Sequence, residues 1–147
     1  MPNNVLIVPI LGLDNAGISD ILDSARNLSS QVRSWTIKTV SEDPCTDLQL
    51  GNLRCLSYKH PQFNIQTISI RAASLAFKIL EAFNSAEDNT LILVERSVEY
   101  FQTVPVQAWF ELRLISELDL ALFNALFKVT FYTLYLTLFS KLISTLF

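Results

Sequence analysis

The strongest candidate for chemistry in this chain is a glycine loop close to the N-terminus. An apolar run over residues 5–11 leads into Gly12, and Gly17 follows after four intervening residues. This is the spacing of a phosphate-binding loop, in which glycines let backbone N–H groups wrap a phosphate at the start of a helix. Ile18 stands where such a loop has the lysine that holds the outer phosphates. The sequence therefore predicts a degenerate phosphate loop, with an ordinary strand-to-helix turn as the alternative.

A second candidate lies in the middle of the chain, where charged residues follow an apolar run. Residues 90–94 are typical of a fully buried strand, and Glu95, Arg96 and Ser97 come directly after it. In open α/β sheets, ligands bind at the edge where the strands have their carboxyl ends. The sequence therefore predicts a binding crevice here, while a solvated ion pair of little energetic value is the simpler alternative.

The elements that must position these residues alternate between strand and helix. This alternation predicts an α/β fold of the P-loop type, with a parallel sheet flanked by helices and an apolar C-terminal segment. The expected strands are residues 5–11, 34–40 and 90–94, and the expected helices are residues 19–32, 64–83 and 106–127, the last broken near Ser116.

Length and composition limit the classes of function. A chain of 147 residues is one small domain, which we divide into an α/β domain over residues 1–127 and an apolar tail over residues 128–147. The net charge of -3, with no basic cluster, argues against a nucleic-acid partner. Cys45, Cys55 and the single histidine His60 cannot assemble a zinc site. Because the N-terminus lacks the order of a signal peptide, we expect a cytoplasmic protein, with membrane association as the alternative.

Taken together, residues 5–125 resemble the deoxyribonucleoside kinases, which transfer the γ-phosphate of ATP to the 5′-hydroxyl of a deoxynucleoside. The most specific match is LVERS at residues 93–97, and WFELRLISELD at residues 109–119 is similar to the segment that follows it in the family. The resemblance implies a catalytic site in which Glu42 is the general base and Arg96 spreads the developing charge. It also implies that Glu95 is a weak ligand for magnesium.

The resemblance assigns the ligand contacts as well. Tyr58 would bind the sugar 3′-hydroxyl and Gln66 the edge of the base, together with Glu95 and Arg96. The phosphate cradle would be formed by the backbone of Gly12, Asn15, Ala16, Gly17 and Ser19.

Departures from the family pattern indicate impaired catalysis. Ile18 replaces the lysine, and the arginine-rich lid of the family has no counterpart. We therefore expect a degenerate relative, a pseudoenzyme that binds a deoxynucleoside or pairs with itself or with a related kinase. ATP and magnesium are implied only by the alternative, an active nucleoside kinase.

The tail after Leu118 is almost entirely apolar, and its structure is left open by the sequence. Residues 129–139 are rich in β-branched and aromatic residues, which favours a further strand followed by a short helix from Ser140. A strand or a buried helix is favoured over a membrane helix. The third possibility is a membrane helix over residues 129–147, in which Thr130, Thr133, Thr137, Ser140 and Ser144 share one face. That possibility corresponds to a membrane-tethered accessory protein.

Overall fold

A three-stranded parallel sheet lies at the centre of a mixed α/β fold. The computed structural model describes residues 4–12, 17–28, 34–41, 59–60 and 63–146. The strands are β1 (Val5–Ile10), β2 (Thr36–Val40) and β3 (Thr90–Glu95), and β3 lies between the other two. In register, Ile10 of β1 pairs with Glu95 of β3, and Val40 of β2 pairs with Val94. All three strands therefore end at the same edge of the sheet.

The position of each strand explains its composition. In the central strand β3, Thr90, Ile92 and Val94 lie on one face and are buried, while the alternating residues are half-buried. β1 is an edge strand, so Pro9, which has no N–H to donate, is tolerated there. Leu6 and Val8 of β1 are exposed.

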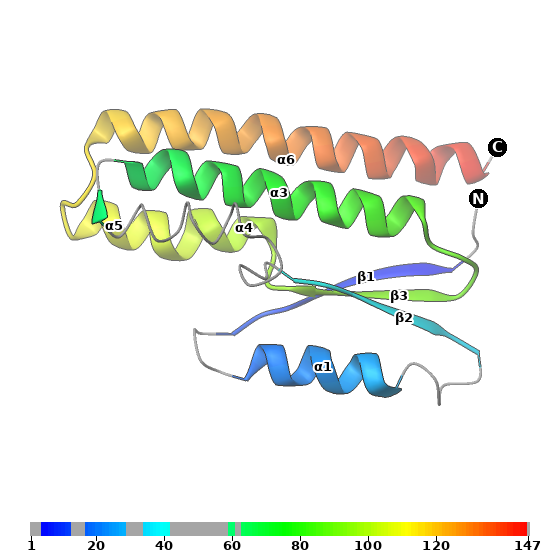
Figure 1. Ribbon diagram of the computed structural model, residues 1–147. Coiled ribbons are helices and arrows are strands. Elements are labelled where there is room, and N and C mark those ends of the chain that lie inside the picture. Colours follow the sequence, from blue (N-terminus) through cyan, green and yellow to red (C-terminus); the bar gives the residue numbers. More distant parts are fainter. Residues whose placement is uncertain (1–3, 13–16, 29–33, 42–58, 61–62, 147) are drawn as a thin grey trace.

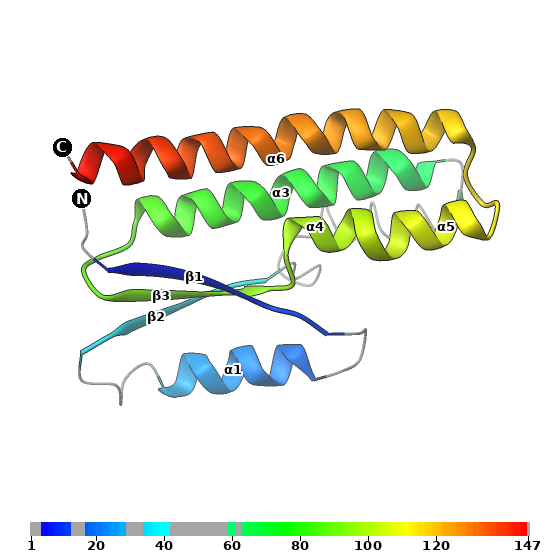
Figure 2. The same cartoon turned by 180° about the vertical axis from the view of Figure 1, so that it is seen from behind.

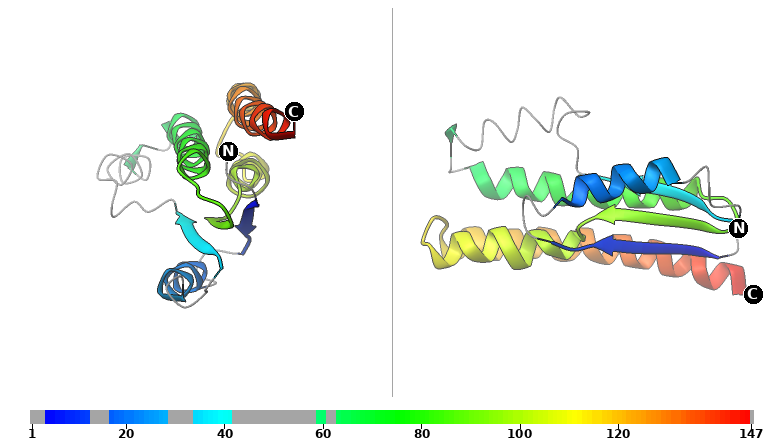
Figure 3. Two further views of the ribbon diagram at one scale, coloured as in Figure 1. Left: turned by 90° about the vertical axis from the view of Figure 1, so that its right-hand side faces the viewer. Right: turned by 90° about the horizontal axis from the view of Figure 1, so that it is seen from below.

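Helices cover the two faces of the sheet unequally. α1 packs on one face against β2 and β3, while the remaining helices lie on the other face, with α6 outermost (Figures 1, 2 and 3). Their bounds are α1 (Ile18–Leu28), α3 (Asn64–Asn84), α4 (Val98–Phe101), the π-helical turn η2 (Gln102–Val106), α5 (Gln107–Glu111) and α6 (Glu117–Leu146).

One hydrophobic cluster joins the sheet to the helices above it. Leu75 of α3, Ile92 of β3, Phe101 of α4, Val106 of η2 and Phe123 of α6 all belong to it. α6 also carries a ladder of aromatic rings four residues apart, from the stacked pair Phe123 and Phe127 to Phe131 and Tyr135. Helix α6 is thus part of the same core as the sheet.

The predicted strands and the helices expected over residues 19–32 and 64–83 are confirmed, with changes at their ends, whereas the helix expected over residues 106–127 begins earlier, at Val98, and its second part runs on to Leu146. The helix expected over residues 64–83 is α3, the strand expected over residues 90–94 is β3, and the predicted break near Ser116 separates α5 from α6. The strand proposed for residues 129–139 is wrong, because α6 runs through this segment without interruption. Packing of the aromatic ladder outweighs local β-propensity here, and Thr130, Thr133 and Thr137 donate their hydroxyls to carbonyls four residues earlier.

Tyr135 links α6 to α4 at the exposed end of the aromatic ladder. Its hydroxyl donates to Glu99 Oε1 at 3.3 Å. Burial, and then the charge and hydrogen bond of Glu99, raise the pKa of Tyr135. This contact is therefore complete below the ordinary tyrosine pKa and is lost only as the pH rises through the raised value.

Helix α6 has the length and composition of a membrane helix, and it also contributes side chains to the hydrophobic core. Over Glu117–Ser140 it is long and apolar enough to cross a bilayer, which needs about 20 residues. Yet Phe123, Phe127 and Leu134 of the same helix are buried in the cluster described above. The helix is therefore an apolar C-terminal segment, one face of which is packed in the hydrophobic core.

A reciprocal cap fixes the start of α6. The Ser116 amide and hydroxyl donate to Asp119 Oδ2 at 2.9 and 2.7 Å, and the Asp119 amide donates to Ser116 Oγ at 3.1 Å. This is a capping box, in which orphan N–H groups of the first turn find partners. The bonds from Ser116 hold the pKa of the Asp119 carboxyl below its usual range.

We expect Ser116→Ala to lower the free energy of unfolding by about 1 kcal/mol at neutral pH, because the cap is lost. Since the pKa of Asp119 is lower in the folded chain, the cap stabilises the fold above the ordinary aspartate pKa and is lost as the pH falls through the lowered value. Urea titrations at neutral and acidic pH measure both effects. Ser97→Ala is the matched control, since Ser97 precedes α4 without a side-chain capping bond. Equal losses for the two variants would contradict the role of the cap.

Candidate functional site

The carboxyl edge of the sheet brings two of the predicted segments together. The Arg96 amide donates to the Ile10 carbonyl at 2.9 Å, so the residues after β3 begin beside the residues after β1. The prediction that Glu95 and Arg96 lie at the end of a buried strand is confirmed. Both side chains are half-buried.

Arg96 adopts an unusual backbone conformation at this edge. Its φ is 63°, in the left-handed region that costs a non-glycine residue about 1–2 kcal/mol. Its guanidinium lies over the ring of Tyr100, with Cζ 4.6 Å from the ring centroid. A strained backbone conformation persists only where surrounding contacts hold it in place, and such conformations are frequent at functional sites.

Of the glycine loop, the structure describes Gly12 and the residues from Gly17 onward. Gly17 has a φ of 75°, and a Cβ there would meet only Asp20 Oδ2 at 3.8 Å, so glycine is needed for the conformation rather than for space. The Gly17 carbonyl accepts from the Ile21 amide at 3.1 Å, which starts α1. Gly12 is half-buried and Ser19 is exposed. Asn15 and Ala16 lie outside the described residues.

Ile18, at the position of the missing lysine, is part of the hydrophobic interior. It is only 6 % exposed and is buried, like Leu22, on the inner side of α1. Apolar packing therefore occupies the position at which the predicted phosphate loop would have its lysine. This residue does not fit a role in holding the outer phosphates of ATP.

Three of the predicted site residues are not placed at this edge by the described structure. Glu42, the candidate base, and Tyr58, the candidate sugar contact, lie outside the described residues. Gln66 is exposed near the start of α3, while its neighbours Ile65 and Thr67 are buried.

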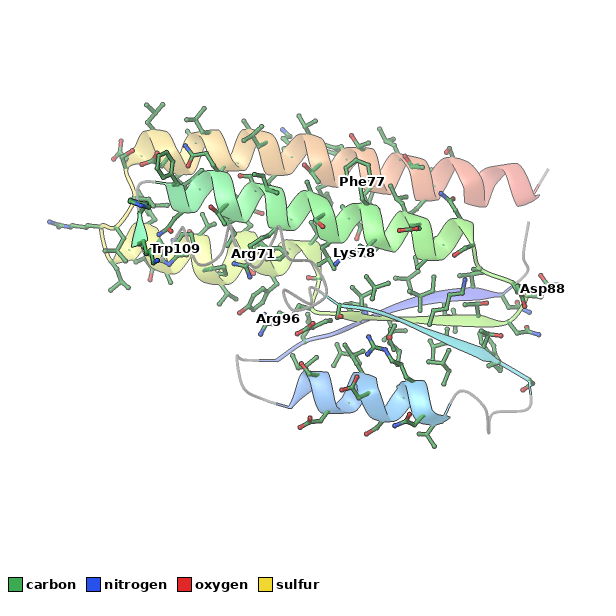
Figure 4. All side chains as sticks on the ribbon, viewed as in Figure 1. Arg71, Phe77, Lys78, Asp88, Arg96 and Trp109 are labelled. Atoms are coloured by element: carbon green, nitrogen blue, oxygen red, sulfur yellow. The ribbon has the colours of Figure 1, made fainter. Side chains whose placement is uncertain are left out.

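Two basic residues of α3 that the sequence reasoning missed also reach this region. Lys78 Nζ donates to the carbonyl of Ser41, directly after β2, at 3.3 Å. Arg71 Cζ lies 5.5 Å from the ring centroid of Phe101, on α4. Figure 4 shows Arg71 and Lys78 on the side of α3 that faces the sheet, with Arg96 at the sheet edge. Their spacing of seven residues, two helical turns, was the sequence signal that could have grouped them.

The two arginines are held by neighbouring aromatic rings. Tyr100, under Arg96, and Phe101, under Arg71, have ring centroids 6.1 Å apart in an edge-to-face arrangement. Cation–π contacts of this type fix the planes of the guanidinium groups, each of which carries several N–H donors. The edge therefore gathers cationic donors that suit an anionic or oxygen-rich ligand.

The described residues at this edge supply fewer groups for binding magnesium than for binding a ligand with oxygen acceptors. Within the part of the chain that the structure describes, no three histidine, cysteine, aspartate or glutamate side chains gather in a group that could hold a metal ion. Glu95 is a single carboxylate at the edge.

Comparison with known proteins adds no family assignment. No family model matches the chain, and no curated protein matches it. What the chain binds must therefore be inferred from its own residues and geometry.

Proposed function

We propose that the carboxyl edge of the sheet binds a deoxynucleoside, in a degenerate P-loop-type domain resembling the deoxyribonucleoside kinases. The observation that carries the proposal is Arg96, whose left-handed backbone is bonded to the end of β1 and whose guanidinium is held over Tyr100. This arrangement keeps an arginine beside the glycine loop at the edge where ligands bind in open α/β sheets.

The charges around Arg96 support a ligand rich in oxygen atoms. Lys78 adds a cation at the end of β2, and Arg71 adds another over Phe101 of α4, the helix that follows β3. Glu95 adds an acceptor at the same edge, which suits a sugar hydroxyl. Hydroxyls and phosphate oxygens are the partners that such donors and acceptors favour.

We propose that phosphoryl transfer by this domain is weak or absent. Phosphoryl transfer depends on positioning and on cations that neutralise the developing charge. Ile18, at the position of the expected lysine, is buried and supplies no such cation. The active kinase, with Glu42 as base and ATP and magnesium as cofactors, remains the alternative to be tested.

We further propose that the domain is cytoplasmic, with α6 packed on it. Withdrawal of α6 into a bilayer would remove Phe123, Phe127 and Leu134 from the core. A membrane-tethered accessory protein is the alternative, favoured by the length and composition of the same helix.

Thermal unfolding with a panel of ligands tests the proposed binding. We expect one or more of the four deoxynucleosides to raise the unfolding temperature, since a ligand at 100 times its Kd adds about 2.7 kcal/mol of stability. ATP with magnesium should give no comparable shift. A shift with ATP–magnesium would favour the active kinase, whereas no shift with any deoxynucleoside would contradict nucleoside binding.

A further inference from the structure

Helix α6 is hydrogen-bonded to the segment formed by α4 and η2 at two points. Gln102 Nε2, at the start of η2, donates to Asn124 Oδ1 of α6 at 2.8 Å, and both residues are half-buried. The Tyr135 hydroxyl of α6 donates to Glu99 Oε1 of α4 at 3.3 Å. Glu99 and Gln102 are separated by only two residues in the chain. The two bonds therefore join α6 to either end of one very short stretch.

The two residues within this stretch carry the arginines of the proposed site. Tyr100 lies under the Arg96 guanidinium, and Phe101, which is 1 % exposed, lies under the Arg71 guanidinium. The ring centroids are 6.1 Å apart, so the two rings form one edge-to-face pair. A shift of the backbone here would move both rings, and with them the surfaces on which both guanidinium groups rest.

Contacts from outside must help to fix the backbone of this segment. Ser97 starts α4 without a side-chain capping bond, and η2 interrupts the helical run over residues 98–111 with a π-helical turn. Pro105 within that turn has no N–H to donate. π-helical turns are rare and are often found at functional sites. The bonds from α6 are therefore placed where the local helical bonding is irregular.

We propose that the Gln102–Asn124 hydrogen bond positions the two arginines of the carboxyl edge, by fixing the aromatic pair beneath them against α6. This inference rests on the proposed function, because it makes α6 a determinant of that same site. Gln102 and Asn124 are positioning residues, which act on a ligand through the arginines. Loss of either amide leaves the other, half-buried, without this partner.

NMR of the free protein reads the arginine positions without any ligand. Ring currents of the aromatic pair shift the side-chain signals of Arg96 and Arg71, because each guanidinium lies over a ring. We expect Asn124→Leu to move both signals towards those of an arginine in an unstructured peptide. Gln102→Leu removes the same bond from the other side and should do the same. The double variant should add nothing further, since both changes break one contact.

Gln107→Leu is the matched control for these variants. It also removes a glutamine amide from the same helical run, but Gln107 Nε2 donates to Glu111 Oε1 within α5, at 3.1 Å. The arginine signals should stay in place in this variant. Circular dichroism verifies that each variant is folded before its signals are compared.

Calorimetric titration measures the consequence for binding, with the deoxynucleoside that gives the largest thermal shift. Asn124→Leu should weaken binding about fivefold, the factor expected for one side-chain hydrogen bond. The swapped variant Gln102→Asn with Asn124→Gln can form the bond with the two amides exchanged. It should recover most of the affinity and both arginine signals, which general loss of stability would not predict.

The two readouts separate this inference from the proposed function. Arginine signals that stay in place in both Asn124→Leu and Gln102→Leu would overturn the inference, whether or not the wild type binds a nucleoside. Equal displacement of the signals by Gln107→Leu would overturn it as well. Displaced signals in a protein that binds no deoxynucleoside would support the link from α6 to the arginines and contradict the function proposed above.

Discussion

Phe123→Ala should lower the free energy of unfolding by about 3–5 kcal/mol, the largest effect that we expect from a single substitution in α6. Phe123 is completely buried and stacks on Phe127, with ring centroids 5.7 Å apart. Through the hydrophobic cluster, its ring is part of the contact between α6 and the helices that cover the sheet. Truncation to alanine leaves a cavity there that the surrounding helices can fill only in part.

Denaturant titration in the absence of detergent measures this loss. Phe77→Ala on α3 is the matched control, because Phe77 is 71 % exposed and its truncation should change stability by no more than about 0.5 kcal/mol. If the two variants were equally stable, α6 would not be packed on the domain in solution. That result would favour a helix that leaves the core for a membrane.

Ile18→Lys should destabilise the domain by about 2–4 kcal/mol without creating kinase activity, because it replaces buried packing with a charge. Ile18 is nine-tenths or more buried, and a lysine in the first turn of α1 also faces the positive end of the helix dipole. An active kinase that lacked only its lysine would instead gain activity from this change. The substitution thus separates the proposed pseudoenzyme from the kinase alternative.

The measurement pairs thermal unfolding with an assay for deoxynucleoside phosphorylation. Ile21→Lys, on the same helix but half-exposed, should leave stability nearly unchanged. A large gain in phosphorylation by the Ile18→Lys protein would contradict the account of a binding domain that has lost transfer.

Elements with a clear period were predictable from the sequence, because local pattern and tertiary burial agree in them. Ile92 and Val94 sit in an uninterrupted apolar run that predicted a buried strand, and the three- and four-residue steps around Ala72 and Ile79 predicted α3. The position of Arg96 at the strand end followed directly. The break near Ser116 was also visible in the pattern.

Features that depend on distant contacts were not predictable in the same way. Residues 129–139 have β-propensity, and only the packing of their aromatic rings makes them helical. Nothing local to Lys78 indicates that it reaches the end of β2, 37 residues earlier in the chain. The burial of Ile18 depends likewise on how α1 docks on the sheet, which a motif comparison does not contain.

Calorimetric titration of Arg96→Gln tests the central claim most directly, using the deoxynucleoside that gives the largest thermal shift. We expect this variant to bind at least about tenfold more weakly than the wild type, because a hydrogen bond from a charged donor contributes about 1.5–3 kcal/mol. Arg113→Gln is the control, since Arg113 is also an arginine with a positive φ, of 58°, but lies between α5 and α6. Loss of affinity in the Arg96 variant alone is the predicted result, and unchanged affinity in that variant would contradict a nucleoside site at the carboxyl edge of the sheet.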